Sequence, residues 1–282
     1  MKTIKIKILL VLMLTTQYIN STVVIWDIGE TILKTNNTSA AFNHFGVFNT
    51  MSYMFSFFNK NGISMNNFKT HMKDFFLDTL SLIPSPCKST KSKSNAKGVT
   101  GKPLPALQRD YLLGEINSKQ VLNSVTKWVK KNKKHFTSKK QREIFVKMVE
   151  LYFDPVINIK NQKYTHCLDL LKKAYEAKDA NGKRKNTCII LSNWPKDSLD
   201  GLRSNFKEIF EYSDMQLFSC NEKLLKPAPD FFELCLFFKQ NKNDVCVFID
   251  DQEDNRQSAQ ELGIIAVHPD NAEKTLKQYS VI

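Results

Sequence analysis

Short apolar runs that end abruptly in polar residues are the clearest pattern along this chain. Three of them, at 22–26, 187–191 and 245–249, are rich in β-branched residues and are followed by Asp27, Ser192 and Asp250. Continuous apolar runs of this length are typical of strands that are buried on both faces of a parallel sheet. Ligands bind outside the carboxyl ends of such strands, so these polar residues are expected to meet at one site.

The segments that separate and follow these runs have helical periodicity. We expect helices over 164–177, 199–210, 229–238 and 256–262, and short strands over 215–218 and 264–267. Pro229 near the start of one helix and Gly263 after the end of another are typical of helix boundaries. Alternating strands and helices predict an α/β fold with a Rossmann-like parallel sheet core.

The middle third of the chain has a different pattern. Between residues 39 and 164 apolar residues, many of them Phe and Met, recur at steps of three and four, which predicts amphipathic helices. The stretch 84–105 is rich in Ser, Lys, Gly and Pro and is expected to be a loop. A mostly α-helical domain at 39–164 is therefore predicted to interrupt the α/β core, which is formed by residues 22–38 and 165–282.

The first 21 residues have the layout of a secretory signal peptide. Three lysines occur within residues 1–7, an apolar run follows at 8–14, and polar residues come next. The apolar run is shorter than a membrane-spanning helix requires. We expect removal of residues 1–21 and a periplasmic or secreted protein. The alternative is a membrane anchor formed by residues 8–14, and contact with a membrane is expected only if this segment is retained.

The charge balance is strongly basic. Among 282 residues, 41 Lys and Arg against 28 Asp and Glu give a formal net charge of +13, which favours anionic partners. A solvated lysine-rich surface would give the same balance, so no specific binding of nucleic acid is predicted, and the oligomeric state stays open. The six cysteines have no metal-site spacing and are interpreted as packing residues or loop thiols.

Together with the segment Lys-Pro-Ala-Pro that begins at Lys226, the three strand ends form an ordered set of four motifs. This set resembles the haloacid dehalogenase-like (HAD) hydrolase superfamily, whose members are mostly phosphatases. The resemblance covers the first strand and the chain from about 187 to 269, but not the middle third. It implies that residues 39–164 form a helical cap that covers the site and selects the substrate.

The resemblance assigns catalytic roles to residues at the strand ends. Asp27 would be the nucleophile and would form an aspartyl-phosphate, as a carboxylate at a strand end can do. Ser192 would donate a hydrogen bond to a phosphate oxygen, and Lys226 would neutralise the negative charge of the nucleophile and the phosphate. Asn193 is expected to bind the substrate, which would be a small phosphorylated molecule.

Two adjacent carboxylates at one strand end predict a bound cation. Burying both is unfavourable unless a positive charge compensates them, and Mg²⁺ prefers a few carboxylates together with water and phosphate oxygens. The resemblance implies the ligands Asp27, the carbonyl of Gly29, and Asp251, with Asp250 beside them. Residues expected to support this site are Glu30, Thr31 and Asn255.

Gly29 departs from the pattern of the superfamily. Most of its phosphatases carry a second Asp at this position, which transfers the proton to the leaving group, and glycine cannot do so. Three functions therefore stay open: a Mg²⁺-dependent phosphatase of small phosphomonoesters, a dehalogenase-like hydrolase of another bond, and a non-catalytic phosphate-binding protein. Asp27, Lys226 and Asp251 favour catalysis, whereas the missing acid favours the other two readings over an ordinary phosphatase.

Overall fold

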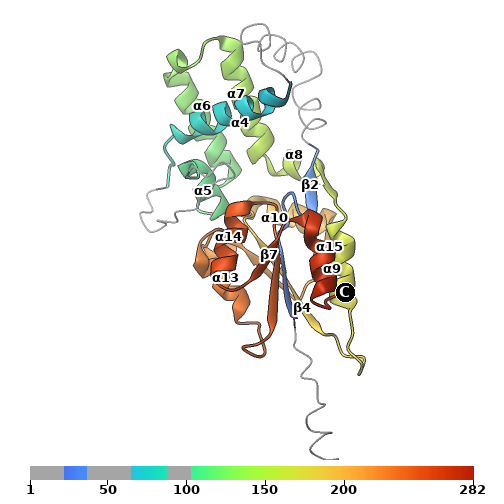
Figure 1. Cartoon of the computed structure of the whole chain (residues 1–282). Coiled ribbons are helices and arrows are strands. Elements are labelled where there is room, and N and C mark those ends of the chain that lie inside the picture. Colours follow the sequence, from blue (N-terminus) through green and yellow to red (C-terminus); the bar gives the residue numbers. More distant parts are fainter. Residues whose placement is uncertain (1–21, 37–64, 88–102) are drawn as a thin grey trace, which may run out of the picture.

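A computed structural model describes residues 22–36, 65–87 and 103–282. It consists of an α/β core and a helical part above it (Figure 1). The predicted signal peptide at 1–21 and the predicted helical stretch at 39–64 lie outside the described residues. No described helix is both long enough and apolar enough to cross a membrane.

The core is built on a five-stranded sheet in the order β5-β4-β1-β6-β7, and all of its neighbouring strands are parallel. The strands are β1 (Thr22–Trp26), β4 (Asn186–Ser192), β5 (Met215–Phe218), β6 (Val245–Ile249) and β7 (Ile265–Val267). In the register of the sheet, Trp26 lies between Ile190 and Ile249. The residues that follow β1, β4 and β6 therefore emerge at the same edge. The predicted α/β fold with a parallel sheet is confirmed.

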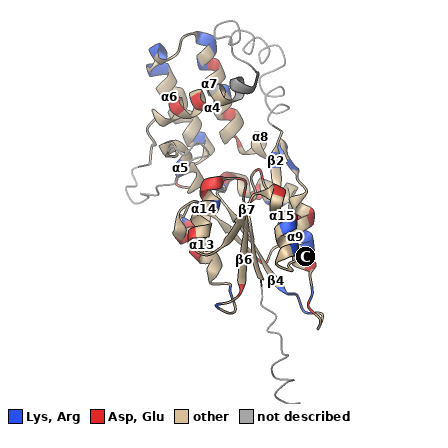
Figure 2. Ribbon diagram, viewed as in Figure 1, with Lys and Arg blue, Asp and Glu red and all other residues tan. Residues whose placement is uncertain are grey.

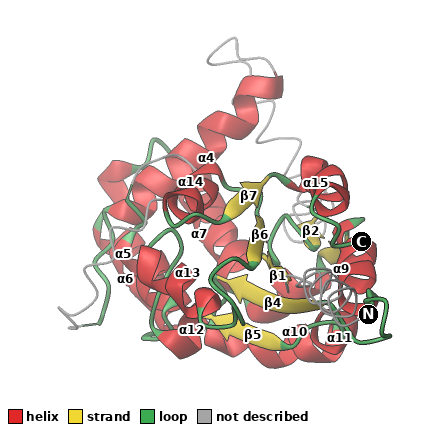
Figure 3. Ribbon diagram, turned by 60° about the horizontal axis from the view of Figure 1, so that its bottom comes forward, coloured by secondary structure: helices red, strands yellow, loops and turns green. Residues whose placement is uncertain are grey.

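Helices cover both faces of the sheet (Figure 3). One face packs against α9 (Cys167–Glu176), α10 (Leu199–Asn205), α11 (Lys207–Glu211) and α15 (Ala272–Gln278), and the other against α13 (Pro229–Leu236) and α14 (Glu253–Glu261). Side chains alternate along a strand, so Val24 and Trp26 join the first layer and Val23 and Ile25 the second. Burial on both faces explains the continuous apolar runs at 23–26, 188–191 and 245–249.

Three of the predicted helices begin or break at other residues. The helix expected from Tyr164 begins at Cys167, because residues 162–164 form β3 (Gln162–Tyr164), which pairs antiparallel with β2 (Leu33–Thr35). The helix expected over 199–210 is broken at Phe206, whose backbone (φ −130°, ψ 52°) is not helical. Helix α14 begins at Glu253 rather than Arg256, and acidic residues in its first turn favour that start.

The helical part has its own apolar core. Its helices are α4 (Met65–Ser81), α5 (Ala106–Leu112), α6 (Ser118–Lys131), α7 (Lys139–Phe153) and α8 (Pro155–Lys160). Large side chains from several of these helices pack together, among them Phe76, Leu80, Val125, Phe145, Val149 and Phe153. Helix α6 starts with a capping box, in which Asn117 and Gln120 exchange side-chain to main-chain hydrogen bonds. Basic residues mark the outer ends of α6 and α7 (Figure 2).

Direct hydrogen bonds join the helical part to the core. Asp197, in the short helix η2 (Lys196–Ser198), accepts a hydrogen bond from the Tyr111 hydroxyl at 2.9 Å and another from the main-chain N–H of Ser118 at 2.7 Å. Ser219 and Lys223 donate to main-chain carbonyls at the end of α5, each at 2.6 Å. The helical part is therefore fixed to the loops that follow β4 and β5.

Candidate active site

The polar residues at the ends of the three central strands converge at the edge of the sheet that faces the helical part. Asp27 follows β1, Ser192 ends β4, and Asp250 and Asp251 follow β6. Carboxylate oxygens of the three aspartates lie within 4.8 Å of one another. Asp27 is 4% exposed and Asp250 is fully buried. The sequence motifs thus meet in space as the parallel topology requires.

Lys226 reaches this cluster from the loop before α13. Its side chain is buried, and its Nζ lies 2.7 Å from Asp27 Oδ1 and 2.7 Å from Asp250 Oδ2. Burial lowers the pKa of the Lys226 ammonium, but the neighbouring carboxylates of Asp250 and Asp27 outweigh burial and raise it. Lys226 therefore stays charged between two anions.

Ser192 and Lys226 hold the same oxygen of Asp27. The Ser192 hydroxyl donates to Asp27 Oδ1 at 2.8 Å, which is also the oxygen nearest to Lys226. Burial raises the pKa of Asp27 to about 6, the attraction of Lys226 opposes this, and the nearby carboxylate of Asp250 adds to it. These contacts orient the carboxylate and engage only one of its oxygens.

The side chain of Asn193 contacts Lys226 rather than an open site. Its Oδ1 accepts the main-chain N–H of Lys226 at 2.9 Å, and its Nδ2 donates to the Lys226 carbonyl at 3.0 Å. The side chain predicted to bind substrate therefore forms hydrogen bonds with both main-chain polar groups of Lys226. The sequence could not show this, because the two residues are far apart along the chain and only the fold brings them together.

Asp250 is occupied on both oxygens. Besides Lys226, it accepts the main-chain N–H of Gln252 at 2.7 Å, and Asn255 donates to both oxygens at 3.1 and 3.0 Å. Arg256 is not among the site residues predicted from the sequence. Its Nη1 donates to the main-chain carbonyls of Asp250 and Asp251 at 2.9 and 2.7 Å and so fixes the turn after β6. The only sequence signal for it was its place in the first turns of the helix after that strand.

Asp251 is the carboxylate that lacks partners. Its Oδ1 is buried and has no hydrogen-bond partner within the described structure. Burial raises the pKa of Asp251 to about 7, and the charges of Asp27 and Asp250 contribute further. An unpartnered buried carboxylate oxygen beside two other carboxylates fits a hard divalent cation such as Mg²⁺. The partners of Asp250 leave Asp27 and Asp251 as the better side-chain ligands.

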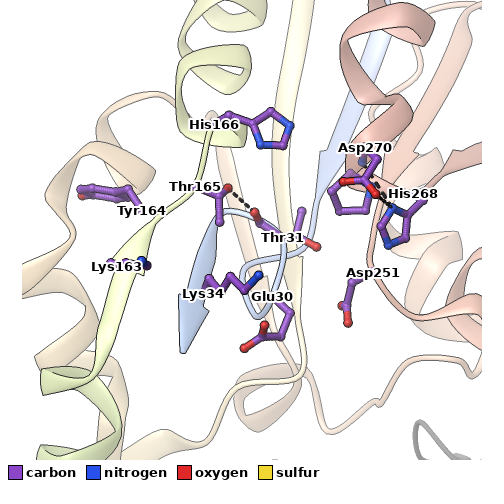
Figure 4. A pocket seen from close by; sticks show the side chains of 11 residues that line it. Glu30, Thr31, Lys34, Lys163, Tyr164, Thr165, His166, Asp251, His268 and Asp270 are labelled. Carbon is purple, nitrogen blue, oxygen red and sulfur yellow. Dashed lines mark hydrogen bonds and ion pairs between the residues drawn. The ribbon is translucent and has the colours of Figure 1, made fainter. Parts of the chain in front are cut away.

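The turn after Asp27 holds the remaining predicted residues. Gly29 is half-buried, and a Cβ placed there would meet nothing within 4 Å. Glu30 has a positive φ of 54°, and its Oε1 accepts the main-chain N–H of Thr35 at 3.0 Å. Thr31 is fully buried and its hydroxyl has no hydrogen-bond partner in the described structure. Glu30, Thr31 and Asp251 line a cavity of about 560 Å³ (Figure 4).

Asp251→Asn is expected to stabilise the metal-free protein at pH 8. The pKa of Asp251 is about 7 in the folded chain against an ordinary value of 3.8, so the folded state binds its proton more tightly than the unfolded state. That stabilisation is present below pH 3.8 and is lost as the pH rises through 7. A difference of this size corresponds to about 4 kcal/mol for a fully buried group. The partial exposure of Asp251 reduces the expected gain to roughly 2 kcal/mol.

Thermal unfolding in the presence of a chelator at pH 5 and pH 8 tests this expectation. The advantage of Asp251→Asn over the parent chain should grow between these two values. Glu233→Gln, which removes an exposed acid on α13, is the control and should show no such growth. An equal advantage of Asp251→Asn at both pH values would contradict the expectation.

No family model matches the sequence. Among curated proteins, bifunctional epoxide hydrolase 2 of Mus musculus is 28% identical over 94 residues, which are 33% of this chain and 17% of that protein. The Rattus norvegicus protein of the same name is 30% identical over 83 residues, which are 29% of this chain and 15% of that protein. The matched region is thus a small part of both relatives.

Solved structures with similar arrangements are described as HAD proteins. A HAD family enzyme of Bacteroides thetaiotaomicron, crystallised with magnesium and inorganic phosphate, is 17% identical, with a TM-score of 0.47, over 88% of this chain and 93% of that chain. A predicted HAD-like family hydrolase of Porphyromonas gingivalis is 14% identical, with a TM-score of 0.48, over 92% of this chain and 96% of that chain. The superfamily in these descriptions is the one that the four motifs of this chain resemble.

Proposed function

We propose that this protein is a Mg²⁺-dependent hydrolase of the HAD type that acts on small phosphomonoesters through Asp27. The observation that carries the proposal is the position of the Lys226 ammonium, which is buried between Asp27 and Asp250, while Asp251 belongs to the same cluster of carboxylates and has an unpartnered oxygen. Phosphoryl transfer requires a nucleophile, positive charge near the phosphate and a site for a metal ion. Asp27, Lys226 and Asp251 could supply these three parts.

Each residue has a role that its contacts support. Asp27 attacks phosphorus with a carboxylate oxygen, the ester oxygen leaves, and water then hydrolyses the aspartyl-phosphate. Ser192 and Lys226, which already hold Asp27 Oδ1, are within reach of phosphate oxygens placed next to it. Asp27, the Gly29 carbonyl and Asp251 would hold Mg²⁺, which supplies positive charge for the phosphate oxygens when bound.

The proton for the leaving group has no evident donor in the turn after Asp27. Gly29 has no side chain, and Glu30 Oε1 is bonded to the main chain of Thr35. We therefore expect aryl phosphates, whose leaving groups need no proton, to be hydrolysed much faster than alkyl phosphates. The aryl ester 4-nitrophenyl phosphate is accordingly the first substrate to test.

The test of the proposal uses the purified chain without residues 1–21, with Mg²⁺ or with excess chelator. Release of phosphate that depends on Mg²⁺ would support a phosphatase. Halide release from a 2-haloacid without phosphate release from esters would reject the phosphatase proposal in favour of a dehalogenase-like hydrolase. Binding of phosphate esters without any turnover, measured by calorimetry, would favour the non-catalytic reading.

Gly29→Asp is expected to raise the rate on alkyl phosphates at least tenfold, because a general acid typically contributes about 10²–10⁴-fold. The added side chain meets no atom within 4 Å of its Cβ, and Gly29 does not have a positive φ. The comparison is kcat/KM for an alkyl and an aryl phosphate in the parent and the variant. Gly29→Asn, of equal size but unable to transfer the proton, is the control. An equal gain from both variants would show that proton transfer is not the cause.

A further inference from the structure

The cavity beside Asp251 has the features of a second binding site. It measures about 560 Å³ and lies between the β2–β3 pair, the start of α9 and the loop after β7 (Figure 4). Asp251 belongs both to this cavity and to the aspartate cluster of the active site. The cavity therefore borders the aspartate cluster at Asp251.

Two lysines on neighbouring strands line one wall of the cavity. Lys34 on β2 and Lys163 on β3 are direct partners in the antiparallel register, and both line the cavity. Like charges directly opposite each other destabilise a strand pair. Neither lysine has an ion-pair partner among residues 22–36, 65–87 and 103–282. An anion between them would remove this repulsion.

Thr31 supplies an unused hydrogen-bond donor at the same place. Its side chain is fully buried, it lines the cavity, and its hydroxyl has no partner in the described structure. Figure 4 shows Lys34 extending from β2 toward the turn that holds Glu30 and Thr31. Burying a hydroxyl without a hydrogen bond is unfavourable, so a ligand oxygen that accepts one would be stabilising.

Two of the three acidic residues that line the cavity already have partners. Glu30 accepts the main-chain N–H of Thr35, and Asp270 lies 3.3 Å from the imidazole of His268. Asp251 is a ligand of Mg²⁺ in the function proposed above. The lysines and the threonine hydroxyl are thus the groups on this wall that still lack a counterpart.

We propose that the cavity is a subsite for a second anionic group of the substrate, a carboxylate or a second phosphate, held by Lys34, Lys163 and the Thr31 hydroxyl. This inference rests on the proposed function and narrows its substrates to phosphomonoesters that carry another negative charge. Monoesters of the same size that lack a second negative charge would fill the active site but leave the two lysines without an anion.

Matched substrates test the subsite. The substrates 2-carboxyethyl phosphate and propyl phosphate differ in the second anion and little in size, and the bisphosphate of 1,2-ethanediol replaces the carboxylate by phosphate. We expect kcat/KM to be at least tenfold higher for the better of the two anionic esters than for propyl phosphate. Which of them is better identifies the second group. The preference should shrink as salt is raised, because exposed charges are screened.

The variant Lys34→Gln/Lys163→Gln should reduce this preference to below threefold. Thr31→Val should reduce it without lowering the melting temperature, because it removes an unpartnered buried hydroxyl and keeps the shape. Lys160→Gln, an exposed lysine at the end of α8 that does not line the cavity, is the matched control. Equal kcat/KM of the parent chain for all three esters would overturn the inference. An equal preference for the anionic esters in the double lysine variant and in Lys160→Gln would also overturn it.

Equilibrium binding separates this inference from the proposed function. Calorimetry with Mg²⁺ and the three esters is carried out on Asp27→Asn, which is expected not to turn them over. Tighter binding of an anionic ester that disappears in the lysine variant would support the subsite even if no ester is hydrolysed by the parent chain. Hydrolysis by the parent chain together with equal binding of all three esters would reject the subsite and leave the phosphatase proposal standing.

Discussion

Asp27→Asn is expected to abolish hydrolysis of phosphate esters, with a loss of roughly 10⁴-fold or more. The amide oxygen is too weak a nucleophile to attack phosphorus, although it can still accept the hydrogen bond from Ser192. The substitution also removes the buried negative charge of Asp27, which lies near Asp250 and Asp251 and raises the pKa of Asp251. The fold should therefore persist, with Lys226 still paired to Asp250 at 2.7 Å.

The measurement is phosphate release by the parent chain and the variant, with their melting temperatures determined on the same preparations. Ser192→Ala is the comparison, because it removes one hydrogen bond to Asp27 but leaves the nucleophile, and its loss should be smaller by at least an order of magnitude. Activity of Asp27→Asn above a tenth of the parent value would exclude Asp27 as the nucleophile.

Lys226→Met is expected to have the largest effect on stability. Methionine fills much of the same volume but leaves Asp27 and Asp250 buried without the cation that lies 2.7 Å from each of them. Removing one partner of a buried ion pair typically costs about 3–5 kcal/mol. The loss should be smaller at pH 5 than at pH 8, because burial raises the pKa of Asp27 to about 6 and its protonation removes part of the unbalanced charge.

A double variant shows whether charge is the cause. Asp250→Asn alone should be destabilising. Added to Lys226→Met, however, it should recover part of the lost free energy of unfolding. Such opposite effects would show a strong coupling between the two sites. Lys223→Met is the matched control. This lysine lies in the same loop but is half exposed and contacts the Leu113 carbonyl and Glu115. Equal losses from Lys223→Met and Lys226→Met, or additive effects in the double variant, would contradict the explanation.

The sequence predicted the central sheet well because burial on both faces leaves a direct trace. Strands β1, β5 and β6 have the predicted bounds, since parallel strands covered by helices are mostly apolar and end where polar residues begin. The convergence of Asp27, Ser192 and Asp250 followed from the topology alone. The turn that contains Gly29 was also predicted at the correct position along the chain.

Features that depend on contacts between distant segments left no such trace. Strands β2 and β3 are three residues long, too short for any periodicity, so the pair that carries Lys34 and Lys163 was not predicted. Asn193 looked like a substrate ligand because it follows Ser192, and only the fold shows that its amide is used by the main chain of Lys226. Arg256 is similar, because an arginine on a helix gives no sign of which carbonyls it will bind.

The hydrogen bonds between the helical part and the core make the active site sensitive to events far from it. Asp197 follows Ser192 and Asn193 in one segment, and Ser219 and Lys223 precede Lys226 in another. The segments that hold the helical part therefore also carry residues of the proposed active site. Gly114 sits at this junction with a φ of +66°, and a Cβ there would approach Cys220 to 3.1 Å. A side chain at this position would push the end of α5 away from Cys220. We expect this displacement to slow turnover even where it leaves substrate affinity intact.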